Sequence, residues 1–379
     1  MMKNNILTNK KYCYGCGVCE IICPKKIISL QLDSEGFYYP TINNNNLCIE
    51  CGLCTSICGF EKTLLPTSET NPKGYAAWSN NDYIRINSSS GGVSYEILSY
   101  AIENGYKACV VRYNIKRNIA EHYIATNKQE LLSSLGSKYI QSYTVKALNE
   151  ININEKNIIV GTPCQIHSIR QYIIKKKCED NFILIDFFCH GVPSIKMWNK
   201  YLKDKTKHLS QINDISWREK STGWHDSWGI KIKTKNIEII NKWSKGDIFY
   251  KLFLGHFCLG KSCHKDCKYK MYHSAADIRL GDLWGNTYSK DDKGVSAIIC
   301  FTDKGKDLVE KANINRIEID KEIVTEGQMK SNANPAYMRS LAMYLLKCPQ
   351  ISIEFLRIPI FIESLIKLPK RIINKLIHL

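Results

Sequence analysis

Two short cysteine runs near the N-terminus constrain the fold of this chain more than any other feature of its sequence. Each run has the spacing C-x₂-C-x₂-C-x₃-C, the first is followed by proline, and the second begins 35 positions after the first. The first run contains Cys13, Cys16, Cys19 and Cys23, and the second contains Cys48, Cys51, Cys54 and Cys58. An internal duplication of this kind predicts two copies of one structural unit.

The spacing is typical of a bacterial ferredoxin module that holds two [4Fe–4S] clusters. Three closely spaced cysteines wrap one face of a cubane, and the fourth leaves on a helix to ligate the other cluster. One predicted cluster therefore binds Cys13, Cys16, Cys19 and Cys58, and the other binds Cys48, Cys51, Cys54 and Cys23. A zinc site fits less well, because it uses pairs of C-x₂-C separated by a longer loop.

The cysteine content also bears on the cellular compartment. The chain has 17 cysteines among 379 residues, and its first residues have no apolar core of the kind that signal peptides contain. Clustered cysteines in a reducing compartment more often bind metal than form disulfides, so we expect a cytoplasmic metalloprotein. No uncharged apolar run is long enough to predict a transmembrane helix.

The formal charge of +17 favours an acidic partner or an anionic membrane surface. A solvated, lysine-rich surface without a partner is the simpler interpretation. Nucleic acid is not expected, because the lysines are scattered along the chain and are not gathered beside aromatic residues that could stack on bases.

The chain is expected to contain a two-cluster domain with an α+β ferredoxin-like fold, two parts of an α/β core, the second of them containing cysteines, and a helical basic tail. Their expected bounds, in this order, are residues 1–62, 75–205, 206–330 and 331–379. The boundary after the first domain rests on residues 61–74, whose prolines, serines and threonines are typical of a linker. Within the first domain, residues 27–32 and 36–39 predict two short strands around a turn.

The core alternates strand-like and helix-like segments, which is typical of an α/β fold. Three strand–loop–helix units place glycines and small hydroxyls at helix starts, with loops at residues 88–92, 161–165 and 189–193. The helix after the second loop is expected to begin near Ile166. Backbone N–H groups at such starts are free to bind phosphate, so three of these loops together favour an anionic cofactor, although tight turns also require glycine.

Several core segments also resemble a known family. They are SSGG at residues 89–92, GSKYIQS at 136–142, GTPCQI at 161–166, CHGVPS at 189–194, REK at 218–220 and DIRLGDLWG at 277–285. In this order they resemble the family of the coenzyme F420 hydrogenase/dehydrogenase beta subunit, which includes flavin-dependent chlorophyll reductases and bacterial members with a fused ferredoxin module. The resemblance implies a flavin, most often FAD and otherwise FMN, bound beside an iron–sulfur cluster. It does not fix the substrate.

The loops and the resemblance together define the residues expected to bind the cofactor. They are Ser89, Ser90, Gly91, Gly92, Ser137, Lys138, Tyr139, Gly161, Thr162, Pro163 and Gln165. Lys138 would place a cation near the flavin, where negative charge develops on reduction, and an exposed lysine without such a role is the alternative. His190 follows a strand at the edge where ligands of α/β proteins bind, and it is the other catalytic candidate. A hydrogen-bonded structural histidine is its alternative, and Asp282 and Trp284 are expected to shape the pocket wall.

Four further cysteines predict a third [4Fe–4S] cluster. They are Cys164, Cys189, Cys263 and Cys267. The first two end strands that face one crevice, and the last two have ligand-like spacing in a loop rich in Gly, Lys and His. A flavin buried in the core is expected to lie far from the N-terminal clusters, so this cluster would serve as a relay. The alternatives are a zinc site with His264 or His273 and a set of free thiols.

These features predict an iron–sulfur flavoprotein oxidoreductase that passes electrons between [4Fe–4S] clusters and a flavin, and on to a small-molecule two-electron substrate. A ferredoxin-like or other redox protein is the expected partner, and surface-polysaccharide metabolism, with which bacterial relatives are often associated, is one expected setting. The alternative is an electron-transfer subunit that serves a partner enzyme.

In the tail, Ile372, Ile373, Leu376 and Ile377 share one helix face opposite basic residues, which predicts a helix packed on the core or, alternatively, peripheral contact with anionic lipid.

Overall fold

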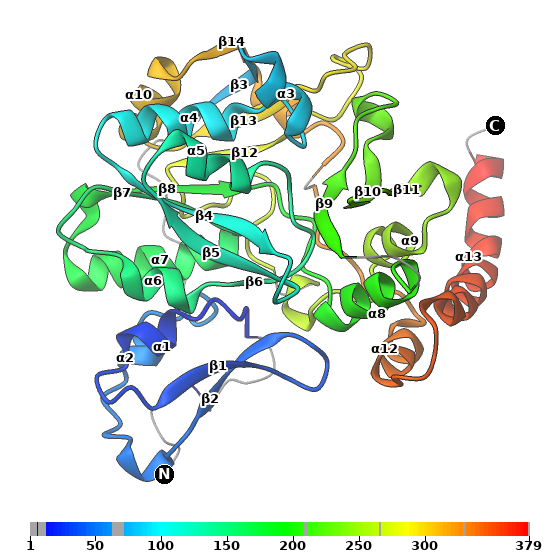
Figure 1. Ribbon diagram of the computed structural model, residues 1–379, viewed down its shortest axis with the longest axis horizontal. Coiled ribbons are helices and arrows are strands. Elements are labelled where there is room, and N and C mark those ends of the chain that lie inside the picture. The colour runs from blue at the N-terminus through cyan, green and yellow to red at the C-terminus, as the bar shows by residue number, and fades with distance from the viewer. Residues whose placement is uncertain are drawn as a thin grey trace.

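The computed structural model describes residue 6 and residues 13–62, 72–207, 211–264, 267–328 and 330–377. Its elements form an N-terminal module, a core built on one large sheet, and a further layer that ends in the C-terminal helices (Figure 1). Most of the expected linker at residues 61–74 lies outside the described residues.

The N-terminal module is a β-hairpin with short helices on either side of it in the sequence. Asp33 Oδ1 closes the hairpin turn by accepting the backbone N–H groups of Glu35 and Phe37, each at 2.9 Å. Gly36 completes the turn with a φ of 84°, so the second strand begins two residues later than expected. The elements are α1 (Val18–Ile22), β1 (Ile28–Leu32), β2 (Tyr38–Ile42), η2 (Asn45–Leu47) and α2 (Leu53–Ser56).

The described strands of the core form one nine-stranded mixed sheet in the order β14-β3-β13-β12-β8-β7-β4-β5-β6. The central strands β12, β8, β7 and β4 are parallel neighbours, and antiparallel pairs flank them on both sides. Parallel strands direct their carboxyl ends to the same edge of a sheet, where α/β proteins bind ligands. The strands are β3 (Lys73–Ser79), β4 (Lys107–Asn114), β5 (Ile119–Ala125), β6 (Ser142–Tyr143), β7 (Asn157–Val160), β8 (Phe182–Phe187), β12 (Ile278–Asp282), β13 (Ser296–Cys300) and β14 (Ile314–Ile319).

Helices cover both faces of this sheet, as predicted for an α/β core. In Figure 1, α4, α5 and α10 lie on one side of it, and α6 and α7 lie on the other. Strand residues alternate accordingly: Ile183 and Ile185 pack with α4, whereas Phe182 and Leu184 pack with α7. The helices are α3 (Asp82–Asn87), α4 (Val93–Glu103), α5 (Lys128–Leu131), η3 (Leu132–Ser134), α6 (Val145–Glu150), α7 (Pro163–Lys176), η4 (Glu179–Asn181), α10 (Asp303–Lys311) and α11 (Lys321–Val324).

The start of α7 differs from the expectation. The helix begins at Pro163, three residues before the expected start near Ile166. Thr162 and Gln165 form a capping box in which Gln165 Oε1 accepts the Thr162 N–H at 2.9 Å, and proline suits the first helical position because its missing N–H would be unpaired there.

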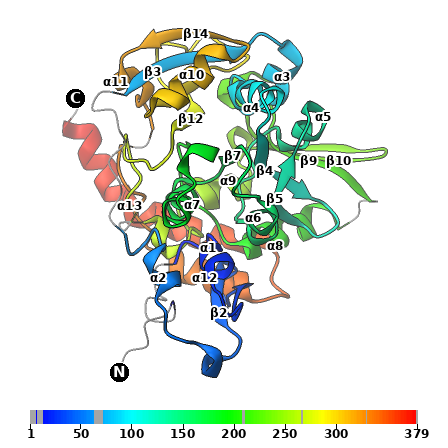
Figure 2. The ribbon, with the colours of Figure 1, turned by 90° about the vertical axis from the view of Figure 1, so that its left-hand side faces the viewer.

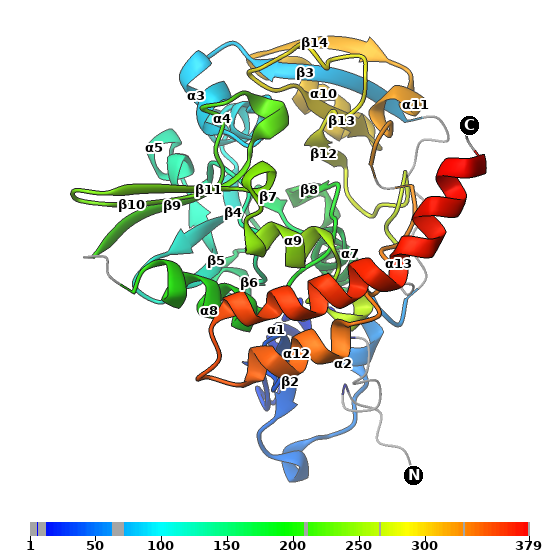
Figure 3. The same ribbon diagram turned by 90° about the vertical axis from the view of Figure 1, so that its right-hand side faces the viewer.

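The further layer contains a three-stranded antiparallel sheet in the order β11-β10-β9. An aromatic-rich cluster that includes Trp198, Trp217, Phe249 and Tyr250 joins this sheet to the neighbouring helices. Helix α13 lies along the outside of the layer (Figure 3), and none of the described helices is long and apolar enough to cross a membrane. The elements are α8 (Ile195–Lys205), β9 (Ile212–Arg218), η5 (Trp224–Asp226), β10 (Trp228–Thr234), β11 (Glu238–Lys242), η6 (Trp243–Lys245), α9 (Ile248–Leu254), η7 (Lys261–Cys263), α12 (Arg339–Lys347), η8 (Ile353–Leu356) and α13 (Arg357–Ile377).

The N-terminal module packs against the core, where α1 contacts α6 and α7 (Figures 1 and 2). Gln141 joins the two parts, because its Oε1 accepts the Tyr38 N–H at 2.7 Å and its Nε2 donates to the Tyr14 carbonyl at 3.2 Å. The Gly59 N–H donates to Ser168 Oγ of α7 at 3.0 Å. The carboxyl edge of the sheet therefore lies close to the cysteine loops.

Candidate functional site

The first predicted set of cluster ligands comes together where the module meets the core. Burial raises the pKa of the Cys19 thiol, and Cys16, Cys13 and Cys58 raise it further. Burial also raises the pKa of Cys16 to about 11, with Cys58 as the next cause. Thiols from both runs therefore interact at one buried place, and because Cys54 of the second set also raises the pKa of Cys19, the crossed division into two sets stays a prediction. Iron fits this donor set, because a cluster binds its ligands as thiolates and neutralises the repulsion among them.

Glycines allow the first cysteine loop to approach the core closely. Gly15 and Gly17 have φ angles of 65° and 76°, values that favour glycine. A Cβ on Gly17 would lie 2.6 Å from Thr144 Oγ1, and one on Gly15 would lie 2.5 Å from the Tyr38 carbonyl oxygen. The loop therefore follows a path that other residues could take only with displacement of the core.

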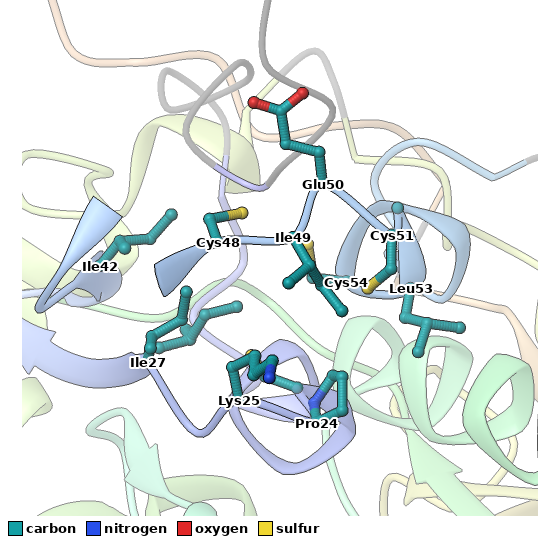
Figure 4. Close-up of a pocket in the computed structure, with 13 residues that line it drawn as sticks. Pro24, Lys25, Ile27, Ile42, Cys48, Ile49, Glu50, Cys51, Leu53 and Cys54 are labelled. Carbon is teal, nitrogen blue, oxygen red and sulfur yellow. The ribbon is translucent and has the colours of Figure 1, made fainter. Parts of the chain in front are cut away.

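The second predicted set lines a small pocket inside the module (Figure 4). Its cysteines are Cys23, Cys48, Cys51 and Cys54. Pro24 and Lys25 lie across the pocket from the second run (Figure 4). Cys51 is exposed, so this site lies nearer the surface than the first. Among the side chains that the structure describes, no three of His, Cys, Asp or Glu are grouped so as to hold a metal ion.

A cavity of about 890 Å³ lies at the carboxyl ends of the parallel strands. It is bordered by the residues that follow β7, β8 and β12, and by the segments at residues 88–92 and 134–142. The module supplies another wall through Cys13, Tyr14 and the hairpin residues within 33–39. All of the residues expected to bind a cofactor line this cavity except Gly91 and Pro163.

Two of the segments expected to bind the cofactor, at residues 88–92 and 136–142, meet at the cavity. Ser89 Oγ accepts the Ser137 N–H at 2.7 Å, which joins the loop before α4 to the segment after η3. The Gly91 N–H donates to Ser296 Oγ of β13 at 3.0 Å, and a Cβ on Gly91 would lie 2.5 Å from the Ala77 carbonyl oxygen. Gly91 therefore packs against β3 and β13, and it does not line the cavity.

The loop at residues 161–165 is held by Gln165, which also caps the helix that follows. Gln165 Nε2 donates to Ser142 Oγ at 3.1 Å, while its Oε1 accepts the Thr162 N–H. Thr162 Oγ1 lies 3.2 Å from Cys164 Sγ, so the hydroxyl and the thiol sit together at the start of α7. This arrangement places a helix N-terminus at the cavity wall, where the helix dipole favours negative charge.

The four cysteines of the expected third cluster lie in one neighbourhood at the cavity, and their grouping around a cluster stays a prediction. Burial raises the pKa of Cys164, and Cys189, Cys263 and Cys267 raise it further. Burial raises the pKa of Cys189 to about 12, with Cys263 as the next cause. All of these thiols except Cys267 line the cavity.

The expectation that a cofactor in the core lies far from the N-terminal clusters is wrong, because Cys13 lines the same cavity as Cys164. Tyr14 lies between the two groups of thiols: burial raises its pKa, and both Cys164 and Cys58 contribute. The sequence could not reveal this proximity, because it depends on how the module packs against the core across residues that are distant in the chain.

The two catalytic candidates both line the cavity. The Lys138 ammonium donates to the carbonyls of Ser133, Ser134 and Leu135 at 3.3, 2.9 and 2.8 Å, and burial lowers the pKa of Lys138 to about 7. The Lys138 side chain is therefore bound by the carbonyl groups of the turn before it.

His190 has a different environment. Burial lowers the pKa of His190 to about 4, with the charge of His256 as the next cause, so the ring is neutral at pH 7. The rings of His190 and His256 lie 4.8 Å apart between centroids. Within the described part of the chain, His190 Nε2 is buried and has no hydrogen-bond partner. A structural histidine would ordinarily have both nitrogens paired.

An aromatic wall closes the side of the cavity next to the three-stranded sheet. The Arg218 guanidinium lies 4.7 Å from the centroid of the Trp228 ring and 5.2 Å from that of Trp284, and it pairs with Asp282 at 3.0 Å. Tyr139 stacks on Trp228 with 5.4 Å between centroids. Asp282 and Trp284 line the cavity, as expected, whereas the sequence assigned no role there to Arg218 or Trp228. Arg218 lies in the REK segment of the family resemblance, and that was the available signal.

Comparison with known proteins agrees with this architecture. The family model for the coenzyme F420 hydrogenase/dehydrogenase beta subunit matches in two parts, its N-terminal part at residues 74–149 and its C-terminal part at residues 154–324. The model of the 4Fe-4S dicluster domain matches residues 12–61. The three matches follow one another along the chain.

Individual relatives are distant. One subunit of the F420H2 dehydrogenase of Methanosarcina mazei is 23% identical over 301 residues, which are 74% of this chain and 80% of the relative. The beta subunit of the coenzyme F420 hydrogenase of Methanococcus voltae is 24% identical over 249 residues, which are 59% of this chain and 82% of the relative. The F420-reducing [NiFe] hydrogenase complex from Methanosarcina barkeri contains a chain that matches 70% of this one with a TM-score of 0.49 and 18% identity, over 90% of its own length.

The two cysteine runs lie within the dicluster match, and the cavity loops at residues 88–92, 134–142 and 161–165 and the four additional thiols lie within the beta-subunit match. The chain belongs to the family of the coenzyme F420 hydrogenase/dehydrogenase beta subunit, and it carries a 4Fe-4S dicluster domain ahead of the family's core.

Proposed function

We propose that this protein is a flavin-dependent oxidoreductase that passes electrons between its [4Fe–4S] clusters and a flavin in the cavity, and on to a two-electron substrate. One observation carries the proposal: the same cavity is lined by Cys13 of the first cluster set, by three of the four additional thiols, and by loops at helix starts. A bound flavin would exchange single electrons with the clusters and an electron pair with the substrate.

The cavity suits a flavin in size and in chemistry. Its volume of about 890 Å³ lies within the range of pockets that bury a cofactor. The backbone and hydroxyls of Ser89, Ser90 and Thr162 would hold the phosphates, because the starts of α4 and α7 favour anions. Trp228, Trp284 and Tyr139 offer a flat apolar wall for a ring system. FAD, FMN and coenzyme F420 all combine phosphate with such a ring, and the relatives' names favour F420 as the substrate.

The additional thiols would hold a third [4Fe–4S] cluster through Cys164, Cys189, Cys263 and Cys267. Burial and the neighbouring thiols raise the pKa of Cys164 and of Cys189, so these thiols are costly to keep together without a metal, and soft thiolate ligands select iron–sulfur clusters or zinc. Because Tyr14 lies between this group and Cys58, the third cluster would pass electrons from the module to the cavity.

His190 would act as a neutral hydrogen-bonding group toward the bound ligand. Its buried Nε2 lacks a partner among the described residues, and its lowered pKa keeps the ring uncharged at pH 7. Such a group can donate or accept one proton at the cavity without placing a full charge there. Lys138 would instead position the segment at residues 134–142, because carbonyl groups already bind its ammonium.

The second candidate function is that of an electron-transfer subunit, because both named relatives are called subunits of an enzyme. In that case the chain would transfer electrons for a partner and would not turn over a substrate by itself. Turnover of reduced F420 with an artificial electron acceptor by the isolated chain would favour the first function. Flavin retention without turnover would favour the second.

The iron content of anaerobically purified protein tests the cofactor proposal. The intact chain should contain about twelve iron atoms and release flavin on denaturation, and Cys263→Ser/Cys267→Ser should lower the iron to about eight per chain. Cys178→Ser/Cys348→Ser is the matched control and should keep all the iron, because both thiols lie outside the expected cluster sets and each donates to a backbone carbonyl of the helix before it. Full iron content in the first variant would exclude the third cluster, and a chain without flavin would exclude the flavoenzyme.

A further inference from the structure

Helix α13 has an apolar face that points away from the protein. Ile358, Phe361, Leu365 and Leu368 have exposed fractions of 50%, 62%, 51% and 49%. Their spacing of three, four and three residues places them on one face of the helix. Surface helices of globular proteins ordinarily turn such a face toward the core.

The inner face of the same helix packs Ile360 on the aromatic-rich cluster and also carries a buried carboxylate. Glu363 is only 4% exposed, and its Oε2 accepts the Met338 N–H at 3.0 Å. Its Oε1 lies 2.7 Å from Lys367 Nζ. Rotating the apolar row inward would break the Glu363–Met338 hydrogen bond and turn Ile360 away from the aromatic-rich cluster on which it packs. The helix is therefore fixed with its apolar row outward.

The position of α13 leaves that row accessible. The helix contacts α9, α12 and η8, and Figure 3 shows it lying across the outside of the molecule beside α12. Ile353 and Leu356, both fully buried, anchor the chain just before the helix begins. A contiguous exposed apolar strip of this kind marks a surface that another body covers.

The charge of the segment identifies that body. Residues 357–377 contain five Lys and Arg residues and one acidic residue, and that acidic residue is the buried Glu363. A second copy of the chain would bring two basic helices against each other, which like-charge repulsion opposes. An anionic lipid surface satisfies both properties, because it attracts the basic residues and accepts the apolar row at the boundary between headgroups and acyl chains.

We propose that α13 binds the surface of an anionic phospholipid membrane, with Ile358, Phe361, Leu365 and Leu368 inserted at the headgroup boundary. The helix would lie in the plane of the surface, because its other face is held to the protein by the Glu363–Met338 hydrogen bond and by Ile360, which packs on the aromatic-rich cluster. The cavity and the clusters would then work beside a membrane, where lipid-soluble electron carriers are found. This inference is independent of the cofactor in the cavity.

Cosedimentation of the full-length, cluster-loaded protein with vesicles tests the proposal. Vesicles of phosphatidylcholine and phosphatidylglycerol in equal amounts should bind the protein, and phosphatidylcholine alone should bind it at least about tenfold more weakly. Raising the salt concentration should weaken the binding. Phe361→Ser/Leu365→Ser should reduce binding to the anionic vesicles at least about tenfold, because two apolar side chains no longer enter the boundary.

The matched control is Ile237→Ser/Ile240→Ser, which changes two apolar side chains of 48% and 39% exposure on the other side of the layer. This variant should bind vesicles like the parent protein. Equal iron content in all variants shows that each has folded. Binding that ignores lipid charge, or that survives Phe361→Ser/Leu365→Ser, would overturn the proposal. So would a dimer in lipid-free solution that this variant dissociates, because the row would then be a contact between two copies.

Discussion

Arg218 shows how one buried charge can hold the wall of a cavity together. Its side chain is fully buried between Trp228 and Trp284, and it donates to both oxygens of Asp282. Burial alone would lower the pKa of Arg218, but Asp282 holds it above its ordinary value. Trp224 Nε1 also donates to Asp282 Oδ1 at 2.8 Å. Asp282 therefore joins β12 to the three-stranded sheet, and the position of the aromatic rings depends on it.

Asp282→Asn should destabilise the protein by about 3 kcal/mol, because the buried Arg218 guanidinium would lose its counter-charge while remaining out of water. Denaturant unfolding followed by tryptophan fluorescence measures the change. Glu238→Gln removes an exposed partner of Lys233 in the same layer, and it should change the free energy of unfolding by less than about 1 kcal/mol. Equal effects of the two substitutions would mean that Asp282 does not support Arg218.

At the scale of elements, glycines with a positive φ stand at the ends of helices, and some of them also allow a close approach to a neighbouring element. Gly17 precedes α1 with a φ of 76° and lies against Thr144 and Val145 beside α6. Gly105 follows α4 with a φ of 83°, but a Cβ there would meet nothing within 4 Å. The two positions share backbone strain and differ in packing, so they form a matched pair.

Gly105→Ala should cost about 1 kcal/mol, which is the strain of a left-handed backbone alone. Gly17→Ala should cost about 2 kcal/mol more, because the new methyl group would displace Thr144 and Val145. It should also lower the iron content, since the displaced loop carries Cys16 and Cys19. Thermal unfolding and iron analysis of both variants provide the comparison. A Gly17→Ala protein with full iron and the stability of Gly105→Ala would show that the loop does not need this close approach.

Elements governed by neighbouring residues could be predicted from the sequence. The hairpin turn needs only Asp33 and Gly36, and β7 and β8 are apolar runs that come directly before the loops expected at residues 161–165 and 189–193. The start of α7 was misplaced because the capping signal of Thr162 and Gln165 was not used, although it was present in the sequence. The outward face of α13 could not be foreseen, since it depends on the burial of Glu363 against Met338, a contact between two different helical segments.

At the scale of the whole molecule, the N-terminal module is a structural part of the cavity. Cys13 and Tyr14 line the cavity, and Gln141 holds Tyr14 and Tyr38 to the core through two hydrogen bonds. The Tyr38 N–H is buried, so it has no access to water if Gln141 is lost. The position of the module therefore depends on a few contacts between residues that are about a hundred positions apart.

Gln141→Ala should destabilise the joint between module and core by about 2 kcal/mol, because a buried N–H group would be left without an acceptor. Hydrogen exchange at Tyr38 should become faster while exchange in β7 and β8 stays unchanged. Gln31→Ala is the control, since Gln31 is exposed and bonds only within the module. Unchanged exchange at Tyr38 in the Gln141 variant would mean that other contacts hold the module in place.

The sequence did not predict which residues from distant parts of the chain line the cavity together. The loops at residues 88–92 and 161–165 were assigned correctly to one cavity because parallel strands share a carboxyl edge. The contribution of Trp228 and the hairpin residues required the three-dimensional packing of separate sheets, for which local patterns carry no signal. The crossed cysteine sets stay a prediction, which rests on the ferredoxin-type spacing of the two runs.

The wall that the module adds to the cavity has a consequence for the order of biosynthesis. The loop of residues 13–19 carries three of the cysteines that would bind the first cluster, and its residues Cys13 and Tyr14 line the cavity. Iron delivery would therefore come before the ligand site is complete. A cell starved of iron would accumulate chains with a folded core and an open site, which release small molecules as readily as they take them up. The supply of iron would then set the number of working sites and not the speed of each one.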